Sequence, residues 1–583
     1  MKKLLTFVLA FSAFCIMSAQ TDAERESLRN EIENDLKTNI LPFWLNNAVD
    51  TVNGGFYGAI ASDGKGIEKA PKSAILGARI LWAFSSAYRL YGVTDYREMA
   101  DMVQQYYLKH IVDHRYGGVY WTVTPDGGID DATKQTYAAA FGIYALSEHF
   151  RATGNRESLD GAKSLFRTLE TKVHDHVRGG YREVHTRDYS GTNVKGIDGR
   201  VGPSKTMNTH IHILEAYTNL YRVWPNDELK KCLAELLDIL STHLYDSTTG
   251  HLILYCDDEW KSLEHVDSYG HDIETSWLMT EAAEVMGDEN VLARVRQQAV
   301  RMADAAIAEG MNGGAKGAVK MPVAGAMIYE KNEKELDRRQ AWWVQSEAVV
   351  GCLNAWQITG NRKYFDQAAS TWEYIKSHFI DPKDGEWWRN LDENGQHNVR
   401  EPKGSMWNCP YHNSRMGYET VARLAPQTVH SEVMAWSNIT GIRLEGELID
   451  FESTLRVGTP GQNIEATGRE RQQNVRYRRE ALTQIVDIPL HGAHFHQEVT
   501  DVDQHNVRLS WTADADTTLE AEGAFFCMSF APKYYADAKI KASGSKVTVS
   551  APERQLTLKF SRSVKTAIRE EDGCKVLYVT LLP

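Results

Sequence analysis

The sequence predicts an all-α (α/α)6 barrel followed by a C-terminal β-rich, sandwich-like domain. Three observations favour this fold class: glycine turns at a regular spacing, helical periodicity between them, and period-two alternation after residue 424. We expect the barrel to span residues 21–424 and the β-rich domain residues 425–583. A chain of 583 residues is too long for one ordinary core, so a large and a smaller domain are expected.

The N-terminal segment is typical of a secretory signal peptide. Lys2 and Lys3 precede an apolar run from Leu4 to about Met17, after which small residues follow. The apolar run is too short to span a bilayer. We therefore expect residues 1–20 to be removed on export. The mature protein is expected to be periplasmic in a Gram-negative host, with no membrane span.

Glycine turns divide the next 400 residues into periods. The first series of turns reads NGGFYG, YGGVYW, RGGYRE, TGHLILY, NGGAKG and DGEWW, with glycines at 54, 117, 179, 250, 313 and 385. A second series, including TGNRES, MGDENV and TGNRKY, falls between them. In this second series glycine is expected to end one helix, with Asp or Asn near the start of the next.

Helical patterns occupy the space between the turns. ILWAFSSAYRLY, FGIYALSEHFRAT and ILEAYTNLYRVW carry apolar residues at i, i+3, i+4 and i+7. Each period therefore holds two helices, and six such pairs would close into a barrel. An open helical solenoid is the alternative, but its repeats are usually shorter, about 35–45 residues. After residue 424, segments such as SKVTVSA and QLTLKFS alternate as strands do.

Composition limits the partners of the protein. The formal charge of −13 argues against nucleic acid or an anionic membrane as the main partner. Fifteen Trp and 26 Tyr residues fill core positions and could also provide platforms for carbohydrate rings. The six cysteines beyond the signal peptide show no CxxC spacing, so neither a disulfide framework nor a zinc site is inferred.

Polar residues recur at the start of the helix after the glycine turn in five of the six periods. In a barrel the same ends of equivalent helices face one opening, so these side chains are expected to converge on one cavity. The candidates are Arg79, Asn208, His210, His212, His271, Glu274, Trp343, Gln345, Glu347, Trp407 and His412.

The segment MNTHIHILEAY contains two histidines that could indicate a metal site. On a strand His210 and His212 would form a chelating pair, but on a helix residues two apart diverge by about 200°. Asn208 and His212, four apart, share a face instead. The sequence has no HExxH motif and no cysteine cluster. We therefore expect a site without a metal.

Histidines with one arginine suit proton transfer beside a carbonyl group. Imidazole, with a pKa near 6.5, both takes and returns a proton near neutral pH. Arg79 could hold an oxygen that becomes negative, and Glu274, three residues after His271, could orient that ring. Glycoside hydrolysis would instead need two facing carboxylates, for which Glu274 and Glu347 are the obvious pair. Hydrolysis is therefore the second choice.

Several longer motifs carry a family resemblance. NILPFW, GGFYG, ARILW, MNTHIHILEAYTNLYRVWP, YGHDIETSWL, QSEAVVG and CPYHN together resemble the cellobiose 2-epimerase family, within the N-acylglucosamine 2-epimerase superfamily, over about residues 25–424. The resemblance implies an (α/α)6 barrel that inverts C2 of the reducing-end sugar in β-1,4-linked disaccharides. Ring opening and a cis-enediolate form the implied chemistry, without metal or redox cofactor.

The resemblance also implies catalytic roles. His271 and His412 would be the acid–base pair, and Arg79 would bind the enediolate oxygens. Glu274 would position His271 or assist ring opening.

Substrate-binding roles follow from the same motifs. Asn208 and His212 would hold sugar hydroxyls and the carbonyl, and His212 would thereby also count among the catalytic residues. Trp343 and Trp407 would stack on sugar rings. The remaining substrate-binding candidates are Gln345 and Glu347. Departures from the family pattern bear on substrate choice more than on reaction type; they are Gly77, Ala78, Ala139 and Val344.

Other functions remain open at this point. The same enediolate would serve an aldose–ketose isomerase or a monosaccharide 2-epimerase. A different class is an (α/α)6 glycoside hydrolase or lyase, and a further one is a non-catalytic sugar-binding protein. For the leading hypothesis the only expected partner is a disaccharide substrate, and a monomer is favoured.

Overall fold

The computed structural model describes residues 22–202, 204–311, 325–424, 431–434, 438–444, 447–462, 464–468, 476–503, 506–515, 523–552 and 555–582. The chain divides into two compact units, Met1–Val421 and Ala422–Pro583. The predicted signal peptide (1–20) and the fifth glycine turn (312–317) lie outside the described residues.

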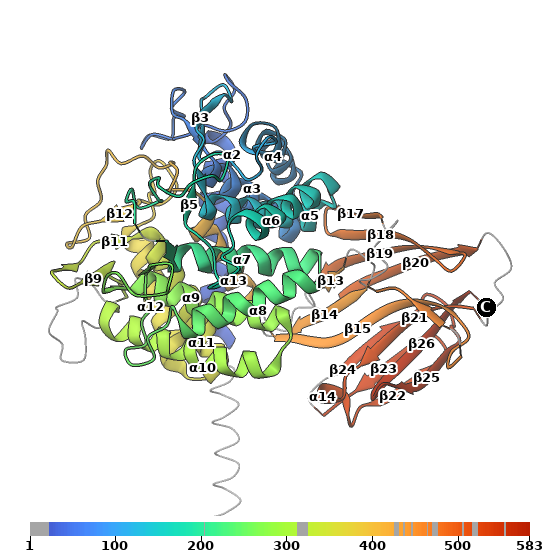
Figure 1. Ribbon diagram of the computed structural model, residues 1–583. Helices are drawn as coiled ribbons and strands as arrows, with labels where there is room; N and C mark the ends of the chain where they lie inside the picture. The colour runs from blue at the N-terminus through green and yellow to red at the C-terminus, as the bar shows by residue number, and fades with distance from the viewer. Residues whose placement is uncertain are drawn as a thin grey trace, which may run out of the picture. The chain divides into compact units, whose positions relative to one another are not determined.

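In the first unit buried helices alternate with amphipathic ones, and every buried helix except the last is followed by an amphipathic helix (Figure 1). The buried helices are α3 (Ala74–Tyr91), α5 (Thr136–Thr153), α7 (Met207–Val223), α9 (Tyr269–Met286), α11 (Trp342–Thr359) and α13 (Tyr411–Leu424). The amphipathic helices are α4 (Thr94–Tyr106), α6 (Arg156–Lys172), α8 (Asp227–Thr242), α10 (Glu289–Ala306) and α12 (Arg362–His378). Two π-helical turns, η2 (Tyr107–Ile111) and η3 (Ile307–Met311), extend α4 and α10.

The buried helices pack in chain order. Helix α5 lies against α3 and α7, and α9 lies against α7 and α11. Helix α13 contacts both ends of this series, because Tyr418 Oη donates to the Ala83 carbonyl of α3 at 2.8 Å and His412 pairs with Glu347 of α11. A further helix, formed by residues 22–35, η1 (Leu36–Ile40) and α2 (Leu41–Asn47), precedes them.

The predicted punctuation of the helices is confirmed. Gly92, Gly154, Gly287 and Gly360 each end a buried helix in the left-handed conformation, with φ between 66° and 78°. Glycine is suited to these positions because it has no Cβ to clash at positive φ. The side chains of Asn155, Asp288 and Asn361 then cap the following helices.

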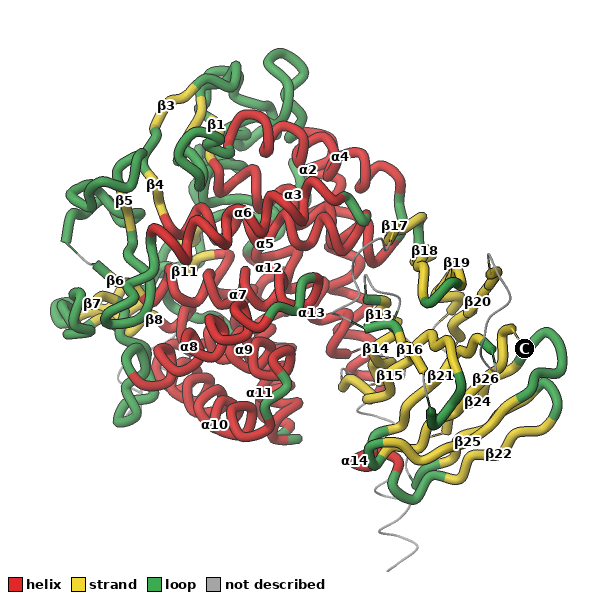
Figure 2. The backbone as a smooth tube through the Cα atoms, turned by 45° about the vertical axis from the view of Figure 1, so that its right-hand side comes forward, coloured by secondary structure: helices red, strands yellow, loops and turns green. Residues whose placement is uncertain are grey.

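A short strand leads into each of five buried helices. These strands are β1 (Lys72–Ser73), β4 (Lys134–Gln135), β6 (Lys205–Thr206), β8 (Val266–Ser268) and β11 (Gln340–Ala341). They pair with β2 (Thr122–Val123), β5 (Val184–His185), β7 (Tyr255–Cys256), β9 (Glu330–Asn332) and β12 (Asn390–Leu391) respectively. Two outer strands, β3 (Ile129–Asp131) and β10 (Leu336–Asp337), extend the first and fourth pairs. Figure 2 shows these strands and their loops gathered at one end of the helices.

A buried ion pair fixes the glycine turn in several periods. In each pair, the aspartate at the start of the glycine turn accepts from a lysine that follows the turn and precedes the next buried helix. The pairs are Lys72–Asp50 at 2.9 Å, Lys134–Asp113 at 2.9 Å, Lys205–Asp175 at 3.1 Å and Lys403–Asp381 at 2.8 Å. Because each lysine is at most 3% exposed, it is held in one position relative to the helix that follows.

The second unit is built of antiparallel β-sheets, which confirms the β-rich prediction. The largest sheet contains β13 (Ser431–Val433), β14 (Ile439–Leu444), β15 (Glu447–Gly458), β16 (Ile464–Ala466), β21 (Ala524–Phe530), β25 (Thr566–Glu571) and β26 (Cys574–Leu582). A second sheet contains β17 (Arg476–Glu480), β18 (Thr483–Leu490), β19 (Ala493–Asp503) and β20 (Asn506–Ala515). The rings of Trp511 and Phe526 join these two sheets with centroids 4.4 Å apart.

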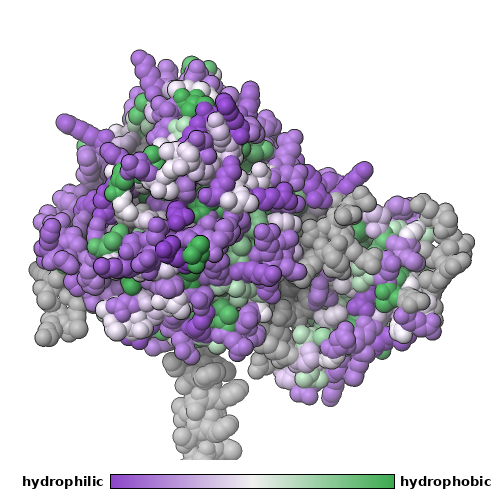
Figure 3. Space-filling view, in the orientation of Figure 1, coloured by the Kyte–Doolittle hydropathy of each residue, from purple (hydrophilic) through white to green (hydrophobic). Residues whose placement is uncertain are grey.

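A third sheet of the same unit contains β22 (Lys539–Ser543), β23 (Lys546–Ser550) and β24 (Gln555–Lys559), and the short helix α14 (Pro532–Tyr535) precedes it. The face of the helical unit seen in Figure 3 is mostly hydrophilic, with small scattered hydrophobic spots. None of the described helices combines the length and the hydrophobicity needed to cross a membrane.

Candidate active site

A cavity of about 330 Å³ lies at the N-terminal ends of the buried helices. It brings together side chains from α3, α5, α7, α9, α11 and α13 and from the segment before α13. Predicted site residues that line it are Arg79, Asn208, His212, His271, Glu274, Trp343, Trp407 and His412. Further lining residues include Tyr137, Asp198, Tyr255, Tyr329, Glu330, Arg339, Trp342, Arg389 and Asn390.

His412 is held by a carboxylate from a neighbouring helix. Its Nδ1 lies 2.7 Å from Glu347 Oε1, while the other oxygen of Glu347 accepts from Trp277 Nε1 at 2.9 Å. All three side chains are buried, although His412 remains on the cavity wall. A hydrogen bond from Nδ1–H to the carboxylate leaves Nε2 as the nitrogen available for proton transfer.

His212 has an equivalent partner on its own helix. Its Nδ1 lies 3.0 Å from Glu215 Oε2, the i+3 position of α7. Asn208 also lines the cavity, so the shared face of Asn208 and His212 meets the site. His210 points elsewhere: its Nε2 accepts from the Tyr181 N–H at 3.0 Å, and its Nδ1 contacts the Thr206 carbonyl.

His271 is held by a neutral group. Its Nδ1 lies 2.7 Å from Ser268 Oγ, and its ring packs on Trp343 with centroids 4.7 Å apart. The expected orientation of His271 by Glu274 is wrong, because Glu274 Oε1 accepts from Arg415 Nη2 at 2.5 Å. The i, i+3 spacing allows the pair to touch, but a charged guanidinium is the stronger partner.

Arg415, which the sequence analysis missed, connects the carboxylates beneath the cavity. Its guanidinium is 1% exposed, and it donates to Glu215 and Glu347 as well as to Glu274. Tyr411 donates to the same Glu215 carboxylate. One arginine of α13 thus joins the carboxylate partners of His212 and His412. The sequence offered one signal for this residue: Arg415 lies three residues after His412, on the same face of a helix.

Arg79 is a second buried arginine at the site, and it lines the cavity. It donates to Tyr137 Oη at 2.8 Å and lies over the ring of Phe141, 4.3 Å from its centroid. Its Nη1 is 3.6 Å from Cys409 Sγ. Among the described residues no carboxylate forms an ion pair with Arg79. A buried cation without a carboxylate partner favours an anionic group in the cavity.

Burial governs the charge state of the cavity histidines. It lowers the pKa of His271 to about 3 and, together with Arg79 and Arg415, lowers the pKa of His412 well below the usual value. Burial also lowers the pKa of His212, although Glu215 opposes this shift. The imidazoles are therefore neutral at neutral pH in the free protein and can act as bases.

The carboxylates beneath the cavity have opposite shifts. Burial alone would raise the pKa of Glu215, but Arg415 and His212 outweigh it and hold that pKa at about 2. For Glu274, burial and the neighbouring Glu347 carboxylate raise the pKa despite the bond to Arg415. Glu274 therefore keeps a proton more readily than an ordinary exposed carboxyl group does.

Four buried polar atoms without partners belong to residues that line the cavity. Arg79 Nε, Trp342 Nε1 and Arg389 Nε are buried donors, and Asn208 Oδ1 is a buried acceptor. None of these four atoms has a hydrogen-bond partner among the described residues. Since buried polar groups are normally paired, these four atoms would suit a ligand that offers both hydrogen-bond donors and acceptors.

Two predicted substrate-binding residues need correction. Gln345 is fully buried and does not line the cavity, because its amide bonds the N–H and the carbonyl of Met327 at 2.9 and 2.8 Å. Glu347 does not line the cavity either, since His412, Trp277 and Arg415 occupy its oxygens. Gln345 therefore supports a loop, and Glu347 positions His412.

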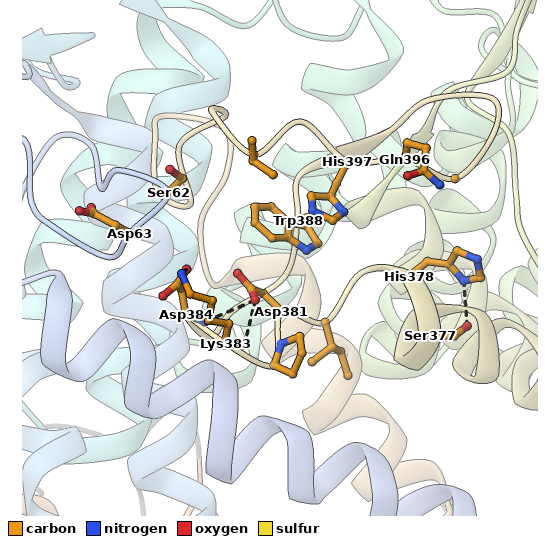
Figure 4. Close-up of a pocket in the computed structure, with 14 residues that line it drawn as sticks. Ser62, Asp63, Ser377, His378, Asp381, Lys383, Asp384, Trp388, Gln396 and His397 are labelled. Atoms are coloured by element: carbon orange, nitrogen blue, oxygen red, sulfur yellow. Dashed lines mark hydrogen bonds and ion pairs between the residues drawn. The ribbon is translucent and has the colours of Figure 1, made fainter.

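A second pocket, of about 690 Å³, lies between the end of α12 with the loops that follow it and the loop that contains Ser62 and Asp63 (Figure 4). It is larger than the first cavity, but its lining does not include the histidine–carboxylate pairs and the unpaired arginine found there. The ring of Trp388 is stacked with His397 at 4.0 Å, and Lys403 Nζ lies 4.1 Å from its centroid. Asp381 is already paired with Lys403. The first cavity is therefore the candidate active site.

Comparisons with known proteins agree with this geometry. A family profile described as N-acylglucosamine 2-epimerase (GlcNAc 2-epimerase) matches residues 55–413. A cellobiose 2-epimerase from Bacteroides fragilis is 42% identical over 397 residues, covering 68% of this chain and 98% of the relative. One from Ruminococcus albus is 36% identical over 405 residues, again covering 68% and 98%.

A solved structure gives the same result. The cellobiose 2-epimerase from Bacillus thermoamylovorans B4167 matches with a TM-score of 0.63 at 36% identity, covering 68% of this chain and all of that one. The chain belongs to the N-acylglucosamine 2-epimerase family, in its cellobiose 2-epimerase branch.

Proposed function

We propose that the protein inverts C2 of the reducing-end sugar of β-1,4-linked disaccharides, such as cellobiose or mannobiose. The observation that carries this proposal is the set of three neutral cavity histidines, each held through Nδ1, beside the unpaired cation Arg79. The names of the relatives, cellobiose 2-epimerases, supply the substrate class.

The first step is opening of the sugar ring. Protonation of the ring oxygen requires an acid, and Glu274 lines the cavity with a raised pKa. His212, backed by Glu215, is suited to remove the proton from the anomeric hydroxyl. The open-chain carbonyl then makes the C2 proton acidic enough to abstract.

The second step exchanges the C2 proton between two faces. One of His271 and His412 removes this proton, and the other returns a proton to the opposite face. Arg79 stabilises the negative oxygens of the cis-enediolate, because its charge is not neutralised by a protein carboxylate. Negative charge on the sugar in turn favours a protonated histidine, which raises the pKa values that burial lowers in the free protein.

Glycoside hydrolysis is less well supported. Glu274 and Glu347 both accept from Arg415 Nη2, at 2.5 and 2.6 Å, and Glu347 does not line the cavity. This pair therefore does not face a glycosidic bond from two sides, as a hydrolase requires. The same guanidinium disfavours a cation between Glu274, Glu347 and His412, so we propose chemistry without a metal.

One experiment separates the candidate reactions. The protein is incubated with cellobiose and with β-1,4-mannobiose in D2O, and the products are followed by NMR. Deuterium at C2 of an intact disaccharide with inverted C2 supports epimerisation. A ketose product would indicate an aldose–ketose isomerase, cleaved sugar a hydrolase or lyase, and no reaction a non-catalytic binder of these sugars. The same assay with EDTA tests the metal-free proposal.

The proposal also covers the architecture of the helical unit and the location of the protein in the cell. The sequence of neighbouring helices, with α13 contacting α3 and α11, supports closure into an (α/α)6 barrel within residues 21–424. We further propose that residues 1–20 direct export, that residues 425–583 form a sandwich-like accessory domain, and that the mature protein is a periplasmic monomer. Mass measurement and fractionation of the expressed full chain test the location, and sedimentation tests the oligomeric state.

A further inference from the structure

The fourth period breaks the pattern of buried ion pairs. Its glycine turn keeps the backbone bonds of the others, since Asp246 N–H donates to the carbonyl of His251 as Asp50 N–H donates to that of Gly55. However, the position of the buried lysine, two residues before the buried helix, is occupied by Asp267. The position of the second turn glycine is occupied by His251.

These replacements remove a cation and add donor atoms. Where Lys72 neutralises Asp50, the fourth period has no lysine at the equivalent position. Asp267, His251 and Glu309 of η3 instead bring one donor atom each to within 4.8 Å of one another. Asp267 and His251 are buried and Glu309 is half-buried.

His251 has the orientation of a metal ligand. Its Nδ1 lies 2.7 Å from Asp272 Oδ2, and the other oxygen of Asp272 is fixed by the Leu252 N–H at 2.9 Å. Its Nε2 is buried, has no hydrogen-bond partner among the described residues, and lies 3.5 Å from Glu309 Oε1. Histidines that bind a metal commonly donate their other ring N–H to a carboxylate, which is the arrangement of His251 and Asp272.

The carboxylates already attract a cation, though weakly. Lys331 Nζ lies 3.3 Å from Glu309 Oε2 and 3.5 Å from Asp267 Oδ2. Its side chain is 49% exposed, so it can move away at little cost. Two carboxylates, those of Asp267 and Glu309, thus share the single positive charge of Lys331.

We propose that His251, Asp267 and Glu309 bind a divalent transition-metal ion, with Asp272 orienting His251. One imidazole and two carboxylates suit Zn²⁺ or Mn²⁺ better than Mg²⁺ or Ca²⁺, which prefer oxygen donors alone. None of the three ligands lines the reaction cavity. The ion therefore has no part in the proposed proton transfers.

The site brackets the start of α9. Asp267 directly precedes Ser268, whose hydroxyl holds His271, and Asp272 directly follows His271. A metal joining Asp267 and His251 to Glu309 would tie both sides of this segment to η3. Its role is thus structural: it holds the backbone that carries His271 in place of the missing lysine.

The test is a metal titration of the full chain after removal of metals with EDTA. Calorimetry with ZnCl2 and with MnCl2 is expected to show one saturable site per chain, and binding should raise the midpoint of thermal unfolding. Glu309→Gln should weaken binding by at least about tenfold. Lys331→Met should strengthen it, because the competing ammonium is removed. Both side chains are partly exposed, so both variants should fold.

The control is His176→Gln, since the partly buried His174 and the exposed His176 form a pair with Nδ1 atoms 3.0 Å apart that could bind zinc adventitiously. This variant should keep the site that depends on Glu309. The proposal is overturned if neither metal binds saturably, or if Glu309→Gln leaves binding unchanged. It is also overturned if Lys331→Met weakens metal binding, because the cluster would then be an ion-pair network alone, with a proton on His251.

Discussion

His271 and His412 reach the same cavity from two walls, α9 and α13, with different support. Ser268, a neutral hydroxyl, holds His271, whereas Glu347, a carboxylate bonded to Arg415, holds His412. A carboxylate partner stabilises an imidazolium and a hydroxyl does so far less. The difference teaches that one wall is suited to a base that starts neutral, and the other to a group that carries positive charge during the reaction.

Removing either histidine should have the largest effect. We expect His271→Asn and His412→Asn each to lower kcat by about 10²- to 10⁴-fold, because each deletes one of the two proton-transfer groups. Each variant should still exchange the C2 proton of one epimer with solvent deuterium, without inversion. NMR in D2O measures this exchange. Inversion at the original rate in either variant would contradict the two-wall arrangement.

The carboxylate wall should be the more sensitive one. Glu347→Gln replaces a charged hydrogen bond, worth about 1.5–3 kcal/mol, by a neutral one. We expect kcat to fall about 10- to 100-fold with little change in KM, since Glu347 does not line the cavity. Steady-state kinetics with cellobiose check this. A variant that changes KM alone would instead make Glu347 a substrate-binding residue.

The pH profile should reveal the shifted histidines. Because burial lowers the pKa of His271 to about 3 and also lowers that of His412, both rings stay unprotonated as the pH falls below 6.5. The acid limb of kcat/KM, which reports on the free enzyme, is therefore expected below pH 6.5. Circular dichroism over the same range controls for unfolding. An acid limb at or above pH 6.5 would rule out neutral, buried bases.

The hydroxyl wall should tolerate substitution better. Ser268→Ala removes a neutral hydrogen bond to His271, worth about 1 kcal/mol, so kcat should fall only about fivefold. The matched comparison with Glu347→Gln decides whether the walls differ. If Ser268→Ala proved as damaging as Glu347→Gln, the contrast between the two supports would have no catalytic meaning.

Gln345 should have the smallest effect on the reaction. Gln345→Met is expected to leave kcat and KM unchanged, since the side chain lies outside the cavity. It should lower stability by about 1–3 kcal/mol, because the buried N–H and carbonyl of Met327 lose their partner. Urea unfolding and the epimerisation assay, run in parallel, check both parts.

The sequence was most informative where periodicity and capping act locally. Gly154 and Asn155 mark one helix end and the next start by their own backbone preferences, and the structure agrees. The helix face shared by Asn208 and His212 was predictable for the same reason. Such inferences need only the geometry of one helix.

Contacts between distant helices were less predictable. Glu347 and His412 are 65 residues apart, so nothing in their spacing pairs them. Glu274 was assigned to His271 because the two are close in sequence, but Arg415, 141 residues away, binds it instead. Competition between partners depends on tertiary packing, which residue spacing does not contain.

The unpaired polar atoms of the cavity wall have a consequence for the life of the protein outside the reaction. Four such atoms lower the stability of the ligand-free fold until a bound ligand forms hydrogen bonds with them: Arg79 Nε, Asn208 Oδ1, Trp342 Nε1 and Arg389 Nε. The proposed substrate is then also a folding ligand. Resistance to proteases should increase with the concentration of the sugar, so that the protein persists longest where it has something to convert.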